Sequence, residues 1–425
     1  MEQPFFQIDK RILALSEQIE EQIAPQLKHI DGIAQYNTCK VQRAFADQRV
    51  SESHFAGTSG YGYDDRGRET LERVFAQVVG AQDSLYRHNF VSGTAALTCA
   101  LFGVLRPGDR MVCLTGTPYD TLHGVIGLLP EHAGRGTLKD FGIQYEQIEL
   151  KDDQIDLGAV SGAVAGAKIA YIQRSRGYSL RRSLSCEDVR LAAAAVKAAD
   201  PQVLVVVDNC YGEFVDTLEP TEVGADLIVG SLIKNPGGGI AQTGGYIAGR
   251  EDLVELCACR LTSPSTGKEV GCTLGQLRSM YMGLFFAPTV VAGAVKTATF
   301  AAALFEAAGY RVSPRWDERR ADIIQTIVLG SGERVSAFCR GVQQGAPVDS
   351  FVTPEAWDMP GYDDPVIMAA GAFNMGASIE LSADAPMREP YACWLQGGLT
   401  WPSGKLGVLL AAQSMLEAGV LFGKK

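Results

Sequence analysis

The spacing of hydrophobic residues changes along the chain, from one helical stretch to alternating short strands and helices. Residues 5–33 carry apolar side chains at helical spacing among acids, which predicts an amphipathic N-terminal helix. From residue 59 short apolar runs alternate with helical segments, which predicts a mainly parallel sheet covered by helices on both faces. Strands are predicted at residues 85–91, 110–115, 168–173, 203–207, 226–229 and 243–249, and helices at residues 69–79, 95–105 and 187–199.

The pattern changes again in the last third of the chain. An apolar, alanine-rich helical region covers residues 276–309, and shorter strands are predicted at residues 325–329 and 378–381. We therefore expect an α/β protein with a helical arm (1–58), a large domain (59–290) and a smaller α+β domain (291–425). The arm would pack on the body or on another subunit.

Residues 261–275 are rich in Ser, Thr, Gly and Pro, so we expect a mobile segment there that acts as a lid.

Composition excludes several classes of function. The 425 residues carry a formal charge of -11, which disfavours nucleic acid and anionic membranes as main partners. No apolar run reaches a membrane-spanning length and the N-terminus has no signal-peptide pattern, so we expect a cytoplasmic protein. The ten cysteines and five histidines form no recognisable metal motif, which favours reduced thiols and no metal.

Two neighbouring predicted strands are followed by side chains that could take part in catalysis. The run at residues 203–207 stops at Asp208, and the next strand is followed by Ser231 and Lys234. In an open parallel sheet both side chains would face the crevice beyond the strand ends. A lysine paired with a carboxylate suits pyridoxal 5'-phosphate (PLP), which needs a Schiff-base lysine and an acid for its pyridinium nitrogen. Each residue alone is also compatible with a turn aspartate or a surface lysine.

A second feature predicts an anion site. A strand leads through Ser92, Gly93 and Thr94 into an apolar helix, so free N–H groups and the positive helix end point to one place. The same residues also suit an ordinary N-cap. Tyr119 follows the next strand into the same rim. The loop after residue 173 holds four arginines that are either solvated or hold an anionic substrate or a neighbouring subunit: Arg174, Arg176, Arg181 and Arg182.

Five motifs carry a resemblance to a known family. They are SGYGYDDRGRETLE from residue 59, SGTAAL from 92, DNCYGEF from 208, GSLIKNPGGG from 230 and TGGYIAG from 243. With them the chain resembles the fold-type I PLP enzymes over about residues 50–415. Within that class it is similar to the cystathionine and methionine lyases of the Cys/Met metabolism family. It looks most like their branch of methionine gamma-lyase-like, or aluminium-resistance, proteins.

The resemblance implies a role for each matching residue. Lys234 would form the Schiff base and move protons, and Asp208 would keep the pyridinium nitrogen protonated. Tyr119 would stack on the cofactor ring. The phosphate would be held at the turn that begins with Ser92, by backbone groups of Gly93 and Thr94 and by Ser231.

The resemblance also implies an assembly. Tyr61 or Tyr63, with Arg66, matches a tyrosine and an arginine that reach the phosphate of a partner subunit, so we expect a homodimer or a dimer of dimers, that is, a homotetramer. The family's Asn-Pro-Thr after that arginine is absent.

The sequence differs from the family at a second place, near the cofactor 3-hydroxyl, where the family has an Asn-Pro pair. Here Gln173 or Arg176 would substitute, and Arg176 is also a candidate substrate ligand. The substrate carboxylate would bind Arg388 of the smaller domain.

The function implied is β- or γ-elimination from a sulfur amino acid by a carbon–sulfur lyase. Two alternatives remain within the fold class, an aminotransferase and an aldolase. Two others involve no turnover by this cofactor: a PLP-binding protein without activity, and an α/β protein that binds no PLP.

Overall fold

The computed structural model describes residues 4–358 and 364–422 and divides the chain into two compact units. The large unit is Asn37–Phe285, and the small unit combines Met1–Tyr36 with Phe286–Lys425. Two long helices, α1 (Lys10–Asp47) and α8 (Leu277–Ala307), each run from one unit into the other. The N-terminal arm thus divides between the two units, whereas the second boundary lies close to the expected residue 290.

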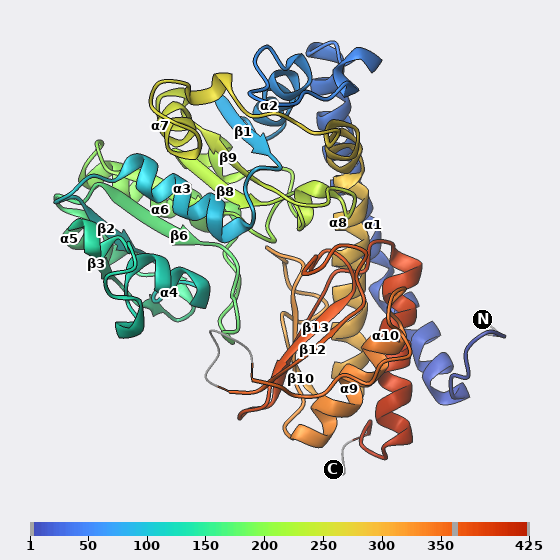
Figure 1. Ribbon diagram of the computed structural model, residues 1–425. Coiled ribbons are helices and arrows are strands. Elements are labelled where there is room, and N and C mark those ends of the chain that lie inside the picture. Colours follow the sequence, from blue (N-terminus) through green and yellow to red (C-terminus); the bar gives the residue numbers. More distant parts are fainter. Residues whose placement is uncertain (1–3, 359–363, 423–425) are drawn as a thin grey trace. The chain divides into compact units, whose positions relative to one another are not determined.

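The large unit is built on a seven-stranded sheet in the order β1-β9-β8-β7-β6-β2-β3 (Figure 1). β9 runs antiparallel to both of its neighbours, and the other strands are parallel to one another, as the sequence predicts. The strands are β1 (Asp83–Arg87), β2 (Arg110–Cys113), β3 (Gln144–Gln147), β6 (Ile169–Gln173), β7 (Leu204–Asp208), β8 (Leu227–Ser231) and β9 (Gly245–Gly249). A separate hairpin pairs β4 (Leu150–Lys151) with β5 (Gln154–Ile155).

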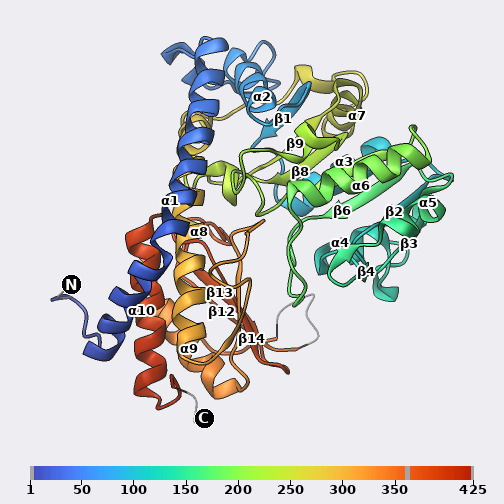
Figure 2. The ribbon, with the colours of Figure 1, turned by 180° about the vertical axis from the view of Figure 1, so that it is seen from behind.

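Helices cover both faces of this sheet, which is why the central strands read as continuous apolar runs. α3 and α7 lie on one face and α5 and α6 on the other (Figures 1 and 2). Along β7, Leu204 and Val206 belong to the core under α3 and α7. The helices of this unit are α2 (Arg66–Val78), α3 (Gly93–Val104), α4 (Asp120–Ile126), α5 (Leu157–Val164), α6 (Cys186–Ala199) and α7 (Glu251–Leu261).

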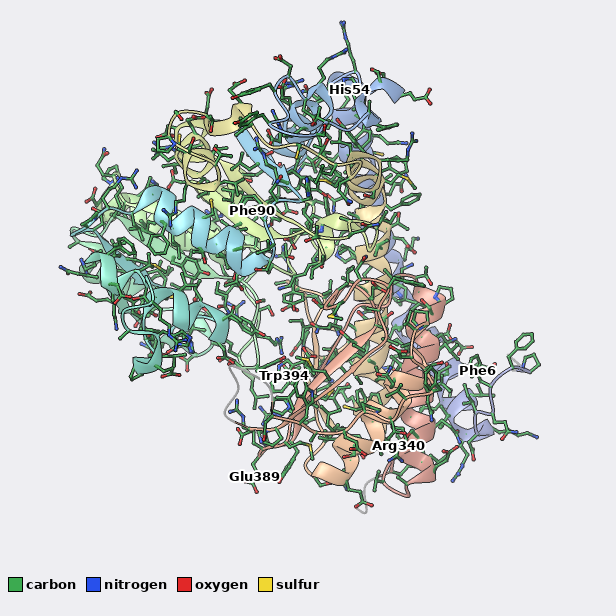
Figure 3. All side chains as sticks on the ribbon, viewed as in Figure 1. Phe6, His54, Phe90, Arg340, Glu389 and Trp394 are labelled. Carbon is green, nitrogen blue, oxygen red and sulfur yellow. The ribbon has the colours of Figure 1, made fainter. Side chains whose placement is uncertain are left out.

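β1 is shorter than expected at its C-terminal end. It stops at Arg87, whereas the apolar pattern extends to residue 91. Phe90, labelled in Figure 3, is buried in the core beside Ala96 and Leu97 of α3. The apolar character of this segment therefore comes from a buried loop residue, not from strand pairing.

The small unit holds a five-stranded antiparallel sheet in the order β10-β11-β14-β13-β12. Helices α9 (Gly332–Gln344) and α10 (Trp401–Glu417) pack together in this unit. Its strands are β10 (Arg311–Ser313), β11 (Gln325–Val328), β12 (Val366–Ala370), β13 (Ser382–Pro386) and β14 (Ala392–Gln396), which carries the Trp394 labelled in Figure 3.

The strand predicted at residues 378–381 is wrong. These residues form a turn, and β13 begins only at Ser382. The buried carboxylate of Glu380 accepts hydrogen bonds from the N–H groups of Phe373 (2.8 Å) and Asn374 (3.0 Å). Side-chain bonding to a loop therefore shapes this segment in place of strand pairing.

α1 continues beyond the predicted helix to Asp47. Ile12, Ile19 and Ile23 are buried in the core of the small unit, so the arm has a partner in its own chain. The buried stripe continues through Asn37 and Ala44, seven residues apart. These small or polar side chains hide the helical pattern after residue 33.

α8 is the one helix within the described ranges that is long and apolar enough to cross a membrane by length and composition. Buried residues make up 72% of its apolar window. A core helix passes the same test.

The segment predicted to be a mobile lid is held in place by two buried arginines. Arg87 donates to the carbonyl oxygens of Val270 (2.6 Å) and Lys268 (2.9 Å). Arg68 donates to Gly271 (2.7 Å) and Glu269 (3.2 Å). Each guanidinium thus joins the loop to the sheet or to α2, and the loop is a fixed part of the large unit.

Candidate functional site

Asp208 and Lys234 follow adjacent parallel strands at one edge of the sheet. Asp208 is the last residue of β7 and pairs in register with Val229 of β8. Its buried carboxylate accepts a hydrogen bond from the N–H of Cys210 at 3.1 Å and faces the hydroxyl of Tyr171 at 3.5 Å. The structure therefore places the acid where the sequence predicts it.

Lys234 begins a short 3-10 turn, Asn235–Gly237, beyond the end of β8. It is half-buried, and its Nζ lies 3.9 Å from the centre of the Tyr211 ring, a cation–π contact. Burial alone lowers the pKa of Lys234, but the acidic groups around it outweigh burial and raise the pKa: Cys210, Tyr211, Asp208 and Glu213. The ligand-free amine is thus held as an ammonium in a pocket of acidic groups.

The N-terminus of α3 approaches the same point. A Cβ built on Gly93 would come 3.1 Å from Cβ of Ser231 and 3.8 Å from Sγ of Cys210. The bare glycine keeps this space open next to the free N–H groups of the first helical turn, a common arrangement for binding phosphate. Ser92 acts as the N-cap, because its Oγ accepts from the N–H of Ala95 at 3.1 Å. The N-cap interpretation of Ser92 and an anion site at Gly93 are thus compatible.

Tyr119, Gln173 and Thr94 line the same edge. Oε1 of Gln173 accepts a hydrogen bond from the N–H of Tyr119 at 2.6 Å, and Gln173 pairs in register with Asp208. Thr94 Oγ1 lies 2.9 Å from Thr121 Oγ1 in α4. The Tyr119 ring packs edge-on against Tyr178, with 6.1 Å between centroids.

The arginine-rich loop is mostly bonded to itself. Arg174 donates to Leu184 O at 3.2 Å and Asn209 Oδ1 at 2.5 Å, Arg181 donates to Gln173 O at 3.1 Å, and Arg182 pairs with Asp188 at 2.7 Å. Arg176 is buried, with Nε 3.3 Å from Ser183 Oγ. The structure therefore assigns Arg174, Arg181 and Arg182 contacts within the loop and its surroundings. The role of Arg176 in substrate binding stays a prediction.

Tyr61, Tyr63 and Arg66 are not joined to this cluster. The two tyrosines are exposed and stack on each other, with ring centroids 5.6 Å apart, and Arg66 is exposed at the start of α2. Within the described chain no hydrogen bond, ion pair or ring contact links them to Asp208 or Lys234. Their service to a partner subunit stays a prediction.

Arg388 lies in the small unit, after β13. Its side chain is exposed and forms an ion pair with Asp364 at 3.1 Å. Because it belongs to the other unit, its role as the ligand of a substrate carboxylate also stays a prediction.

Three residues next to the site were missed by sequence reasoning. Tyr211 lies under the lysine amine, Glu213 is buried behind it, and Asn235 anchors the lysine loop by donating to the Glu213 carbonyl at 2.9 Å. Tyr211 and Glu213 lie in the motif DNCYGEF, where an acid between glycine and aromatic residues is the signal that would have pointed to them.

The side chains at this edge fit PLP. An amine and a carboxylate lie at the ends of adjacent strands, and the cradle at Gly93 would be filled by any Cβ. Among the described residues no group of three metal-ligating side chains occurs, and all ten cysteines are free thiols.

Comparisons with known proteins agree with this geometry. The model of the methionine gamma-lyase family matches residues 12–416. Protein YnbB of Bacillus subtilis is 46% identical over 403 residues, which cover 94% of this chain and 95% of YnbB.

Two solved structures are similar over nearly the whole chain. A carbon–sulfur lyase involved in aluminium resistance from Clostridium novyi is 49% identical, with a TM-score of 0.93 and coverage of 96% of both chains. A protein from Clostridium acetobutylicum, described as a candidate cystathionine beta-lyase involved in aluminium resistance, is 47% identical with the same TM-score and coverage. The sheet order and these matches confirm the predicted fold-type I architecture. The chain belongs to the methionine gamma-lyase family.

Proposed function

We propose that this protein is a PLP-dependent lyase that cleaves a carbon–sulfur bond in a sulfur amino acid. The observation that carries the proposal is the placement of Lys234 and Asp208 at the ends of β8 and β7, beside the open cradle at Gly93. Family membership and the lyase from Clostridium novyi support carbon–sulfur cleavage over other reactions of this fold.

The cofactor supplies an aldehyde that reacts with amines and a protonated ring that accepts the electrons released at the substrate Cα. With the cofactor bound, the amine of Lys234 would hold its aldehyde, and the freed Nζ would be placed to take a proton from the substrate Cα. Asp208 would keep the ring nitrogen protonated, because a carboxylate favours the charged form of a neighbouring base. Gly93 and Thr94 offer N–H groups to the phosphate and Ser231 its hydroxyl.

The substrate carboxylate requires a cation, for which Arg388 and Arg176 are the candidates. Tyr119 would stack on the cofactor ring, and its N–H bond to Gln173 holds its backbone at the strand end. With water, β- or γ-elimination then gives a 2-oxo acid, ammonia and a thiol. The identity of the products distinguishes the two eliminations.

The test is product analysis with a panel of cysteine, cystathionine and methionine. We expect a visible absorption band from bound PLP, and equimolar ammonia and 2-oxo acid released without an added acceptor. Borohydride should fix the cofactor to Lys234. A requirement for an acceptor oxo acid would indicate an aminotransferase, and carbon–carbon cleavage an aldolase. A band without turnover would indicate a binding protein, and fixation to another lysine would disprove the site.

A further inference from the structure

The turn that follows Asp208 brings a second carboxyl group behind Lys234. Tyr211 and Phe214 have φ angles of +72° and +62°, a region that side chains other than glycine rarely adopt. The N–H of Gly212 bonds to Asn209 O at 2.9 Å and closes the turn. Asn37 of α1 donates to the carbonyl oxygens of Phe214 (3.2 Å) and Asp216 (2.9 Å) and holds the turn from outside. The strained backbone is thus fixed on several sides.

This turn is hydrogen-bonded to the lysine loop, which consists of Lys234 and the 3-10 turn Asn235–Gly237. Asn235, the residue after Lys234, donates to the backbone carbonyl of Glu213 at 2.9 Å. A Cβ on Gly230 would come 2.6 Å from Glu213 Oε1, so the glycine in β8 makes room for the carboxyl. The Glu213 side chain therefore has a place built for it beneath the lysine loop.

The Glu213 carboxyl is 1% exposed and only half satisfied. Oε1 accepts a hydrogen bond from the Tyr246 hydroxyl at 2.7 Å. Oε2 is buried and has no hydrogen-bond partner among the described residues. A buried oxygen without a partner costs free energy that a purely structural side chain could avoid. The charge of Lys234 acts on this carboxyl and lowers its pKa, so the two groups interact electrostatically.

Burial raises the pKa of Glu213 to about 8, although the Tyr246 hydrogen bond and the charge of Lys234 act against burial. Glu213 is in turn one of the acidic groups that raise the pKa of Lys234. Near neutral pH the carboxyl therefore carries a proton, and above about pH 8 it becomes a second negative charge beside the amine.

We propose that Glu213 is a positioning residue that sets the protonation state of Lys234. Ionised Glu213 holds the amine as an ammonium, and protonated Glu213 leaves it able to become neutral. This inference rests on the proposed function in one respect, namely that the Lys234 amine reacts with the cofactor aldehyde and accepts a proton. Only neutral Nζ can bond an aldehyde or accept a proton from Cα.

Other titratable groups face the same carboxyl. Two phenols come from the sheet, Tyr86 of β1 and Tyr246 of β9, and the pKa of each is raised first by burial. Further titratable or charged groups act electrostatically on Glu213, on Lys234 or on both: Cys210, Tyr211, Asp208, Glu219 and Arg174. Glu219 is a second buried glutamate in this region, with hydrogen bonds from Asn209 (3.0 Å) and Phe214 N–H (2.8 Å), so Glu219→Gln is the matched control.

The experiment measures how readily Lys234 reacts with acetic anhydride in the full-length protein stripped of bound aldehyde. Acetylation requires a neutral amine, and mass spectrometry compares Lys234 with the exposed Lys151 in the same sample. We expect Glu213→Gln to increase Lys234 labelling about tenfold at pH 9, the effect of one pKa unit, and less than about twofold at pH 6.5. Glu213→Asp should keep Lys234 labelling at pH 9 as low as in the wild type. Glu219→Gln should leave Lys234 labelling close to that of the wild type at both pH values.

An equal change at both pH values would indicate a structural role and overturn the proposal, as would wild-type labelling in Glu213→Gln. If that variant does not fold, Tyr246→Phe removes the hydrogen bond but keeps the carboxyl. The pH at which ionised Glu213 begins to suppress Lys234 labelling should then be higher than in the wild type. An unchanged pH would also overturn the proposal.

The labelling needs no cofactor, so the two proposals fail separately. A labelling shift without a PLP absorption band removes the proposed function alone. A PLP band without a shift removes the inference on Glu213 alone.

Discussion

The lysine loop and the loop at residues 57–66 differ in whether their polar side chains are buried within the fold or exposed to solvent. Around Lys234 the polar groups come from the same unit and are mostly buried: Asp208, Glu213, Asn235 and Tyr246. In the other loop Tyr61, Tyr63 and Arg66 extend into solvent, although the backbone beneath them is bonded to residues 271–274. Buried polar groups need partners within the fold, whereas exposed aromatic and cationic side chains on a rigid backbone suit contact with another molecule. The groups around Lys234 therefore have their partners within one unit, whereas contact of the exposed loop with a partner subunit stays a prediction.

The largest effect should come from removing the amine of the self-contained site. Lys234→Ala should lower kcat by about 10²- to 10⁴-fold, because it removes the amine proposed to take the Cα proton. The visible absorption band of the bound aldehyde should also disappear. Lys151→Ala is the control, since Lys151 is exposed on β4. Full activity in Lys234→Ala would show that this region is not the site.

Removing the acid should separate binding from chemistry. Asp208→Asn should keep PLP bound but lower turnover by about 10- to 1,000-fold, the effect of one to three pKa units from a neighbouring charge. Cofactor content by absorbance and steady-state rates are the measurements. Unchanged turnover with full cofactor content would remove Asp208 from its role.

Two arginines in one helical turn sharpen the contrast between buried and exposed groups. Arg68 is 2% exposed and donates to backbone carbonyls of Gly62, Glu269 and Gly271, whereas Arg66 is exposed. Arg68→Ala should lower the free energy of unfolding by about 2–4 kcal/mol, because it leaves buried carbonyls unpaired. Arg66→Ala should change it by less than about 0.5 kcal/mol. Urea titrations of both variants provide the test, and equal losses would contradict this assignment.

Glu213 should make stability depend on pH. Its pKa is raised from an ordinary 4.5 to about 8, so the folded protein holds a proton that the unfolded chain releases. The stabilisation is complete below pH 4.5 and is lost as pH rises through about 8. Relative to Glu213→Gln, wild-type unfolding free energy should fall by about 1.4 kcal/mol per pH unit between pH 5 and 7.5. Parallel pH profiles for the two proteins would contradict a buried, protonated Glu213.

The exposed loop can be tested by mixing inactive variants. If Arg66 serves a partner's phosphate site, a mixture of Lys234→Ala and Arg66→Ala should regain partial activity, because a hybrid assembly contains one site with both residues intact. Native mass spectrometry must show subunit exchange. With exchange shown, absence of rescue would mean that Arg66 acts within its own subunit, and full activity of Arg66→Ala alone would mean that it has no role.

Local sequence determined the central strands of the large sheet and the two main chemical groups. Runs such as residues 203–207 are apolar at every position because both faces are covered, so their ends at Asp208 and before Lys234 could be read directly. Since parallel strands share one carboxyl edge, the pairing of acid and lysine followed without coordinates. The turn into α3 at Gly93 was also predictable, because a strand-to-helix turn is a local feature.

Contacts between distant residues decided the rest. Whether Arg66 or Arg68 is buried depends on a loop about 200 residues later, and nothing in their own neighbourhood distinguishes them. The extension of α1 past residue 33 relies on Asn37 bonding to the turn at residues 214–216. Glu213 acquires its proton only because β9, the lysine loop and Gly230 close around it. The spacing of hydrophobic residues predicts the type of each secondary-structure element and where a strand ends. The burial and charge of a side chain depend on the residues packed around it.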